Sequence, residues 1–83
     1  MTGLDELLRL IETTRQTETV YPREGDDDFE PYDQLVITAH VEIDGVEYTQ
    51  VSTLAPNAYP EVVNSVESLT REHLARQVIE ARR

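Results

Sequence analysis

The feature that most constrains the fold of this chain is an alternating apolar and polar pattern that ends at an Asp-Gly dipeptide. Every second residue from 35 to 43 is apolar: Leu35, Ile37, Ala39, Val41 and Ile43. A period of two is typical of a half-buried β-strand. Asp44-Gly45 follows directly, and this dipeptide is preferred in tight two-residue hairpin turns. Residues 34–54 are therefore predicted to form an antiparallel β-hairpin.

The length of the turn sets the register of this hairpin. A two-residue turn predicts the cross-strand pairs Ile43–Val46, Val41–Tyr48, Leu35–Leu54 and Glu42–Glu47. A three-residue loop would shift the register by one residue and move Tyr48 to the other face. We expect the two-residue turn, because it gathers the apolar side chains on one face. Its cost is the like-charge pair of glutamates.

The N-terminal residues 1–16 carry a helical pattern. Apolar residues follow the i, i+3, i+4, i+7 spacing of one buried stripe: Leu4, Leu7, Leu8 and Ile11. Thr2 and Asp5 have the spacing of a capping box, and Glu12 and Arg15 are spaced to pair on the outer face. The threonines that follow weaken a helix, so we expect it to end near Gln16.

Residues 17–33 are predicted to hold an edge strand and an acidic loop. The stretch "TETVYP" alternates threonine with other β-compatible residues and stops at a proline, as edge strands do. The next twelve residues, 23–34, contain six carboxylates and one arginine. Their glycine, proline and aspartates argue against regular structure.

Residues 58–82 are predicted to be helical, with a break near residue 70. Two apolar stripes, over 62–69 and 74–81, have centres that differ by about 100°, so one straight helix would not bury both. Thr70 is a good N-cap, and Leu69 and Leu74 have the spacing of a hydrophobic staple. We therefore favour a kinked or two-part helical segment; one continuous, bent helix is the alternative.

Together these elements predict a single α+β domain over residues 1–83, in which the hairpin and a third, edge strand are packed by an N-terminal and a C-terminal helix. The expected core is Leu4, Leu7, Leu8, Ile11, Leu35, Ile37, Val41, Ile43, Tyr48, Leu54, Val62, Val66, Leu74 and Val78. Eighty-three residues without cysteine give a marginal core and no disulfide. Self-association would add stability, and we expect a homodimer.

The charge of the chain is strongly negative and unevenly spread. The net charge is −10; residues 1–33 hold ten acids and three arginines, 34–54 three acids and no base, and 55–83 four of each. This distribution argues against direct binding of nucleic acid or of an anionic membrane. Every base is arginine, which also fits a high-GC genome or a salt-adapted cytoplasm. No apolar run approaches the roughly 20 residues of a membrane span, and we expect no signal peptide and a cytoplasmic location.

Catalytic, metal and cofactor sites are not supported by the sequence. An EF-hand loop starting at Asp26 would need glycine and glutamate where Pro31 and Ile37 stand. His40 and His73 are isolated, and the sequence has neither a phosphate loop nor a nucleophile elbow. The order helix, three strands, helix is that of the double-stranded-RNA-binding domain, but the basic cluster on which that module relies is missing. We therefore expect a non-enzymatic protein without metal or cofactor.

The remaining candidate for function is an acidic surface that binds a protein. Its predicted members are Glu24, Asp26, Asp27, Asp28, Phe29, Glu30, Tyr32, Asp33, Glu42, Asp44 and Glu47. Carboxylates can occupy a basic groove built for phosphates, and the aromatics would anchor the complex. Small phage inhibitors of host nucleic-acid-handling defences have a similar composition, and such a protein would act in the host cytoplasm. Two alternatives stay open: a self-associating subunit of a virion or other assembly, and a salt-adapted domain with an undetermined partner.

Overall fold

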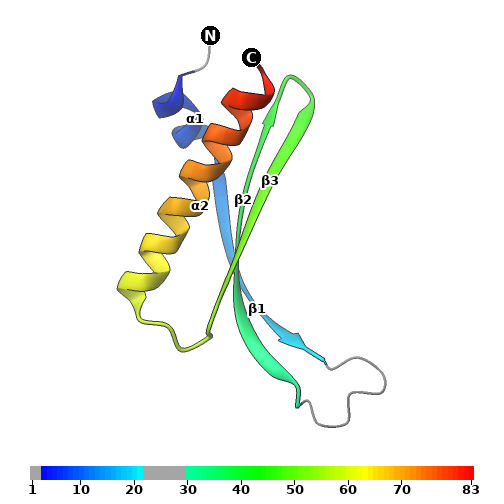
Figure 1. Cartoon of the computed structure of the whole chain (residues 1–83), viewed down its shortest axis with the longest axis vertical. Helices are drawn as coiled ribbons and strands as arrows, with labels where there is room; N and C mark the ends of the chain where they lie inside the picture. Colours follow the sequence, from blue (N-terminus) through cyan, green and yellow to red (C-terminus); the bar gives the residue numbers. More distant parts are fainter. Residues whose placement is uncertain (1–2, 22–29) are drawn as a thin grey trace.

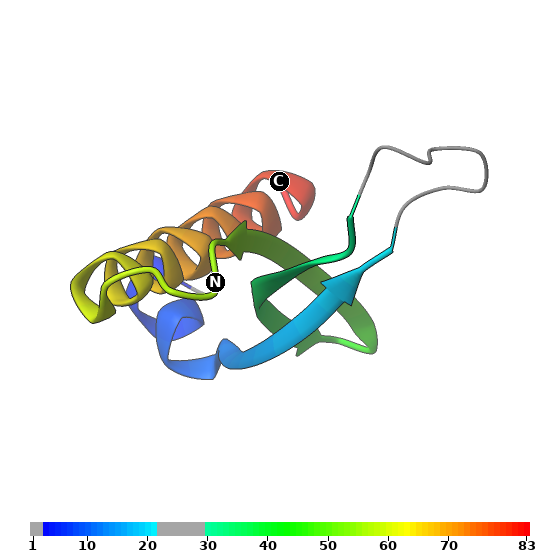
Figure 2. The same cartoon turned by 90° about the horizontal axis from the view of Figure 1, so that it is seen from below.

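The computed structural model describes residues 3–21 and 30–83. The elements in chain order are α1 (Leu4–Leu10), β1 (Glu12–Val20), β2 (Tyr32–Ile43), β3 (Val46–Leu54) and α2 (Pro60–Ala81). The three strands form one antiparallel sheet in the order β1-β2-β3 (Figure 1). Both helices pack against the same face of this sheet (Figure 2). The predicted α+β fold is confirmed. Neither described helix is long and apolar enough to span a membrane.

The hairpin has the predicted turn and the predicted register. Ile43 pairs with Val46, and the ladder continues without a bulge to the pair Leu35 and Leu54. The two turn residues, Asp44 and Gly45, have φ of 51° and 79°. Positive φ at both positions is the type I′ conformation, whose twist matches that of the flanking strands.

The N-terminal helix is shorter than predicted, because the chain changes from helix to strand at Ile11. α1 ends at Leu10, and the segment from Glu12 onward, which was assigned to the helix, is the first half of β1. The composition of "ETTRQTETV" explains the change, since threonine and valine fit a pleated strand better than a helix. The edge strand predicted in "TETVYP" is thus confirmed as part of β1, which begins earlier and ends at Val20. Thr2 lies outside the described residues, and Gly3 occupies the N-cap position.

The predicted break in the C-terminal helix is wrong, because α2 is continuous through Thr70. This residue is 3% exposed and lies within the buried stripe. Its hydroxyl donates to the carbonyl of Val66 at 2.7 Å and lies 2.7 Å from the hydroxyl of Ser52 on β3. The buried stripe is completed by a polar residue, and Leu69 is 56% exposed instead of acting as a staple.

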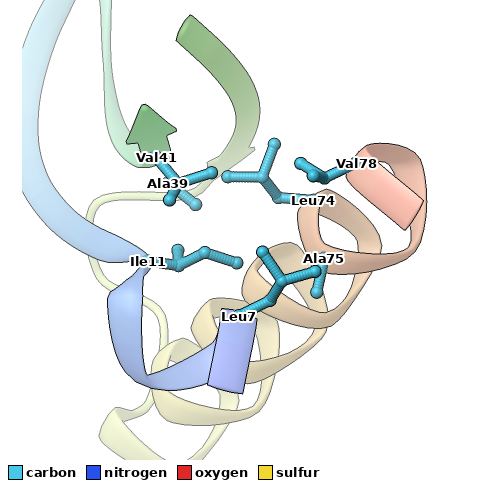
Figure 3. Packing of buried hydrophobic residues seen from close by; sticks show 7 residues of the cluster. All are labelled: Leu7, Ile11, Ala39, Val41, Leu74, Ala75 and Val78. Carbon is cyan, nitrogen blue, oxygen red and sulfur yellow. The ribbon is translucent and has the colours of Figure 1, made fainter. Parts of the chain in front are cut away.

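The core lies between β2 and the two helices. Its buried cluster is Leu7, Ile11, Ala39, Val41, Leu74, Ala75 and Val78 (Figure 3). Most predicted core residues are fully or partly buried, and the partly buried ones include Leu4, Leu8, Leu35, Ile43, Tyr48, Leu54 and Val66. Val62 was predicted in the core and is 44% exposed. Sequence reasoning missed Val36, Ala39, Val63 and Ala75, which are all buried.

The molecule is elongated for its length. Its radius of gyration is 15.7 Å, whereas a compact chain of this length has about 12 Å. The ends of β1 and β2 near residues 20 and 32 extend away from both helices (Figure 1). One face of the sheet is therefore covered by helices and the other is not.

Candidate functional site

The uncovered face of the sheet, here called the open face, holds three members of the predicted acidic surface, Tyr32, Glu42 and Glu47. Strand alternation and the two registers assign fifteen residues to it: Glu12, Thr14, Gln16, Glu18, Val20, Tyr32, Gln34, Val36, Thr38, His40, Glu42, Glu47, Thr49, Val51 and Thr53. Val36 is 8% exposed, although no helix covers it. Its cross-strand partners on this face are Gln16 of β1 and Thr53 of β3.

The open face carries negative charge only, apart from one histidine. Four glutamates lie on it: Glu12, Glu18, Glu42 and Glu47. None of the arginines in residues 3–21 and 30–83 belongs to this face. Arg15 is on β1 but points to the helix side, where it bonds to Glu67.

Three of these glutamates lie at the same end of the open face as His40, near the hairpin tip. Glu12 of β1 stands opposite His40 in the ladder, and its Oε2 lies 3.6 Å from the imidazole Nε2. Glu42 is two residues further along β2 on the same face, about 7 Å away. Glu47 of β3 pairs directly with Glu42, so two like charges oppose each other. Each of the three strands thus contributes one carboxylate to this corner.

The other end of the sheet holds the described residues closest to the acidic loop. Glu30 is exposed, and Tyr32 is 47% exposed at the start of β2. Asp33 lies on the helix-facing side of the strand and accepts a hydrogen bond of 2.7 Å from the Thr19 hydroxyl. Glu18 lies on the open face, opposite Gln34.

The predicted acidic surface is divided between the two ends of β2. Eleven residue steps separate Tyr32 from Ile43, a distance of about 36 Å along a strand. The members of the predicted surface near Tyr32 therefore cannot form one compact patch with those near the tip. Five other predicted members, Glu24, Asp26, Asp27, Asp28 and Phe29, lie outside the described residues.

Asp44 has a structural role at the tip. Its carboxylate pairs with the guanidinium of Arg82, which joins the hairpin turn to the end of α2. The hydrogen bond that the Arg82 guanidinium donates to the Tyr48 oxygen, together with the pairing with Asp44, raises the pKa of Arg82 above its ordinary value. Because Arg82 neutralises it, Asp44 adds little to the negative field.

The described arginines lie outside the open face, and four of them are paired with acids. The ion pairs there are Arg15–Glu67, Arg76–Glu72, Arg82–Asp44 and Arg83–Glu80. Glu67 also accepts a hydrogen bond from Thr13. That bond, together with the bonds from Arg15, lowers the pKa of Glu67. Four of the described arginines thus pair with carboxylates outside the open face.

Glu12 and Glu18 are functional candidates that the sequence reasoning missed. Glu12 was assigned to a helix, so its place beside Glu42 and Glu47 was not considered. The β-branched run from Thr13 to Val20 was the signal that could have placed both glutamates on a strand. Their alternation with Thr14 and Gln16 then puts them on one face.

Metal chemistry and known families give no further assignment. Among residues 3–21 and 30–83, no group of three or more His, Cys, Asp or Glu side chains is arranged to hold a metal ion. The chain matches no protein-family model, and no curated protein or solved structure is significantly similar to it. The open face is therefore the candidate functional surface.

Proposed function

We propose that this protein is a non-enzymatic interaction protein that binds a basic protein surface through the open face of its sheet. One observation carries the proposal: this face is uncovered and bears four glutamates and no arginine. The described arginines lie elsewhere, and four of them are held in ion pairs. A face with one sign of charge attracts a partner of opposite sign over a long range.

The partner class that fits this face is a protein with a basic groove for nucleic acid. Such a groove is built to neutralise a row of phosphates, and carboxylates in a row can take their place with release of the same counterions. The glutamates extend from Glu47 at the tip to Glu18 near the far end of β1, with threonine and valine side chains between them. Tyr32, half-exposed at that far end, supplies an aromatic anchor. The proposed activity is inhibition by occupation of the groove, as in a phage-encoded anti-defence protein.

The test compares two charge-neutralised variants as baits in a lysate of the native host. The first combines Glu12→Gln, Glu42→Gln and Glu47→Gln on the open face. The matched control combines Asp5→Asn, Glu6→Gln and Glu61→Gln, which removes the same charge from exposed positions on the helices. Proteins retained by the wild type are identified by mass spectrometry, and their association and dissociation rates are measured at several salt concentrations.

We expect the open-face variant to associate about tenfold more slowly and with a weaker salt dependence, while the control stays within about twofold. Tyr32→Ala should instead speed dissociation, because an anchor acts after encounter. A combined Asp26→Asn, Asp27→Asn and Asp28→Asn variant tests the loop in the same assay. If the triple-glutamine variant binds every partner with wild-type rates, the open face is not the binding surface and the proposal fails. If the triple-asparagine variant also binds normally, the acidic loop is excluded as well. The acidity would then be explained by salt adaptation, which predicts changes only in solubility or in stability at high salt.

A further inference from the structure

The two edges of the sheet differ in how they are protected. β1 and β3 are the edge strands, and a free edge pairs readily with another chain unless charges, proline or a bulge prevent it. β1 contains three charged residues, and one of them, Arg15, points inward to Glu67. β3 has a single charged residue, Glu47, next to the turn, and its nine residues contain no proline and no bulge. The edge of β3 is therefore the unprotected one.

The turn determines which backbone groups of β3 face this edge. In a two-residue hairpin the residues that flank the turn, Ile43 and Val46, exchange hydrogen bonds with each other. The ladder then alternates, so every second residue of β3 directs its amide and carbonyl away from β2. These residues are Glu47, Thr49, Val51 and Thr53.

Where α2 passes the middle of this edge, the described side chains that line the space between them include no carboxylate or arginine. Glu67 and Arg71 lie on the β1 side of α2, where both contact Thr13. Val66, Leu69 and His73 lie on the opposite side of the helix, which is the side of the β3 edge. With residues of β3 they line a hollow of 190 Å³, whose walls are Gln50, Ser52, Val66, Leu69, Thr70 and His73.

We propose that a second copy of this chain occupies the β3 edge, with the two β3 strands antiparallel across a two-fold axis. The pairing makes one six-stranded sheet, and Leu69 of each copy is covered against the partner's β3 and α2. This interface is distinct from the binding function proposed above, because it uses the strand edge and the helix flank. It also places the two open faces side by side on one surface.

Charge favours a second copy at this position. Each copy carries −10, so contact through most of the surface brings carboxylates together. The middle of the β3 edge avoids this, because residues 48–53 and the walls of the hollow beside them include no carboxylate. In a pairing centred on Gln50, Glu47 stands opposite Thr53 of the partner subunit, about 20 Å from the partner's Glu47. This separation exceeds the screening length of about 8 Å at physiological ionic strength.

The size of the surface is sufficient for a specific dimer. A strand of nine residues is about 30 Å long, and the sheet and helix layers are each about 10 Å thick, which gives roughly 600 Å² per copy. The total of about 1,200 Å² is at the lower end of stable interfaces. The monomer is elongated, with a radius of gyration of 15.7 Å, so it has a large solvent-exposed surface relative to its buried core. Dimerisation would reduce the solvent-exposed surface of each copy.

The test measures mass in solution with two proline variants. Val51→Pro removes an amide that faces the free edge of β3 and leaves the ladder to β2 intact. Thr17→Pro is the matched control, since the same alternation directs the amide of Thr17 to the free edge of β1. Light scattering at about 100 μM should give twice the 9.5 kDa chain mass for the wild type and for Thr17→Pro. Val51→Pro should weaken the dimer at least tenfold, because two symmetry-related hydrogen bonds are lost.

Amide hydrogen exchange of the wild type supplies a second measurement that needs no variant. The amides of Thr49, Val51 and Thr53 should be protected at least tenfold more at high than at low protein concentration. The amides of Thr13 and Thr17 should exchange at the same rate at high and at low protein concentration. A wild-type particle of 9.5 kDa overturns the proposal. A dimer whose β3 edge amides are not protected overturns it as well, because the copies would then meet through another surface.

Discussion

Replacing Ile37 with alanine tests the packing of the sheet against the helices at its most enclosed point. Ile37 is fully buried on the helix-facing side of β2, between Arg15 of β1 and Ser52 of β3. Both neighbours are tied to α2. The Arg15 guanidinium donates to Glu67 at 3.0 Å and to Asn64 at 2.9 Å, and the Ser52 hydroxyl lies 2.7 Å from that of Thr70. The walls around Ile37 therefore cannot move inward easily.

The expected loss follows from this enclosure. Removing three carbon atoms costs about 2.4 kcal/mol in transfer free energy. The cavity that remains raises the loss to about 3–4 kcal/mol, because the surrounding side chains relax only partly. A domain of this size has a stability of roughly 4–12 kcal/mol. The substitution should thus remove a quarter or more of the free energy of unfolding and lower the melting temperature by about 12–32 °C.

Urea unfolding followed by circular dichroism measures this loss at a fixed protein concentration, since dimerisation would shift apparent stability. Leu10→Ala is the control: it removes the same number of carbon atoms from a side chain that is 51% exposed. We expect it to cost about 1 kcal/mol. If Ile37→Ala costs less than about 0.5 kcal/mol, or no more than the control, β2 does not present Ile37 to the helices and the register is wrong.

Two further substitutions test local features of the fold. Glu67→Gln should destabilise the protein by about 1 kcal/mol at pH 7. Because the folded-state pKa of Glu67 is lowered from its usual 4.5, this contribution is complete above pH 4.5 and is lost as the pH falls through the folded pKa. Urea titrations from pH 7 downward should show the free energies of unfolding of Glu67→Gln and the wild type converging. A difference between these free energies that does not change with pH would contradict this. Gly45→Ala should cost about 1–2 kcal/mol, because Gly45 has a φ of 79°, which residues with a side chain rarely adopt. No neighbour obstructs the new methyl group, so backbone strain is the source of this cost. An unchanged melting temperature would mean that another turn type is accessible.

The hairpin could be predicted from the sequence because its determinants are local. A period of two and the Asp44-Gly45 dipeptide together specify a register, and a slip by one residue would turn every apolar side chain of β2 away from the helices. The like-charge pair of Glu42 and Glu47 was predicted for the same reason and is present. Two members of the open face were thus placed correctly, in a cross-strand pair, before any tertiary contact was known.

The helical segments were predicted less well because their limits depend on contacts between distant residues. In α2, the buried face was predicted from the spacing of apolar residues, which leaves out Thr70. The burial of this threonine depends on its hydrogen bonds to Ser52 and to the carbonyl of Val66. The same spacing predicted Val62 in the core, although this side chain is 44% exposed. Periodicity alone does not identify which stripe meets the sheet.

Residues 12–16 show most clearly what only the tertiary structure decided. By local pattern they continue the helix that begins at Leu4, since Ile11 completes its apolar stripe and Glu12 and Arg15 have a helical pair spacing. As a strand they gain a backbone ladder with β2, and Arg15 gains hydrogen bonds to Glu67, 52 positions away. Local pairs on a helix contribute only tenths of a kcal/mol, so the long-range pairing wins. That choice also brings Glu12 beside Glu42 and Glu47, so the acidic corner of the open face exists only in the folded chain.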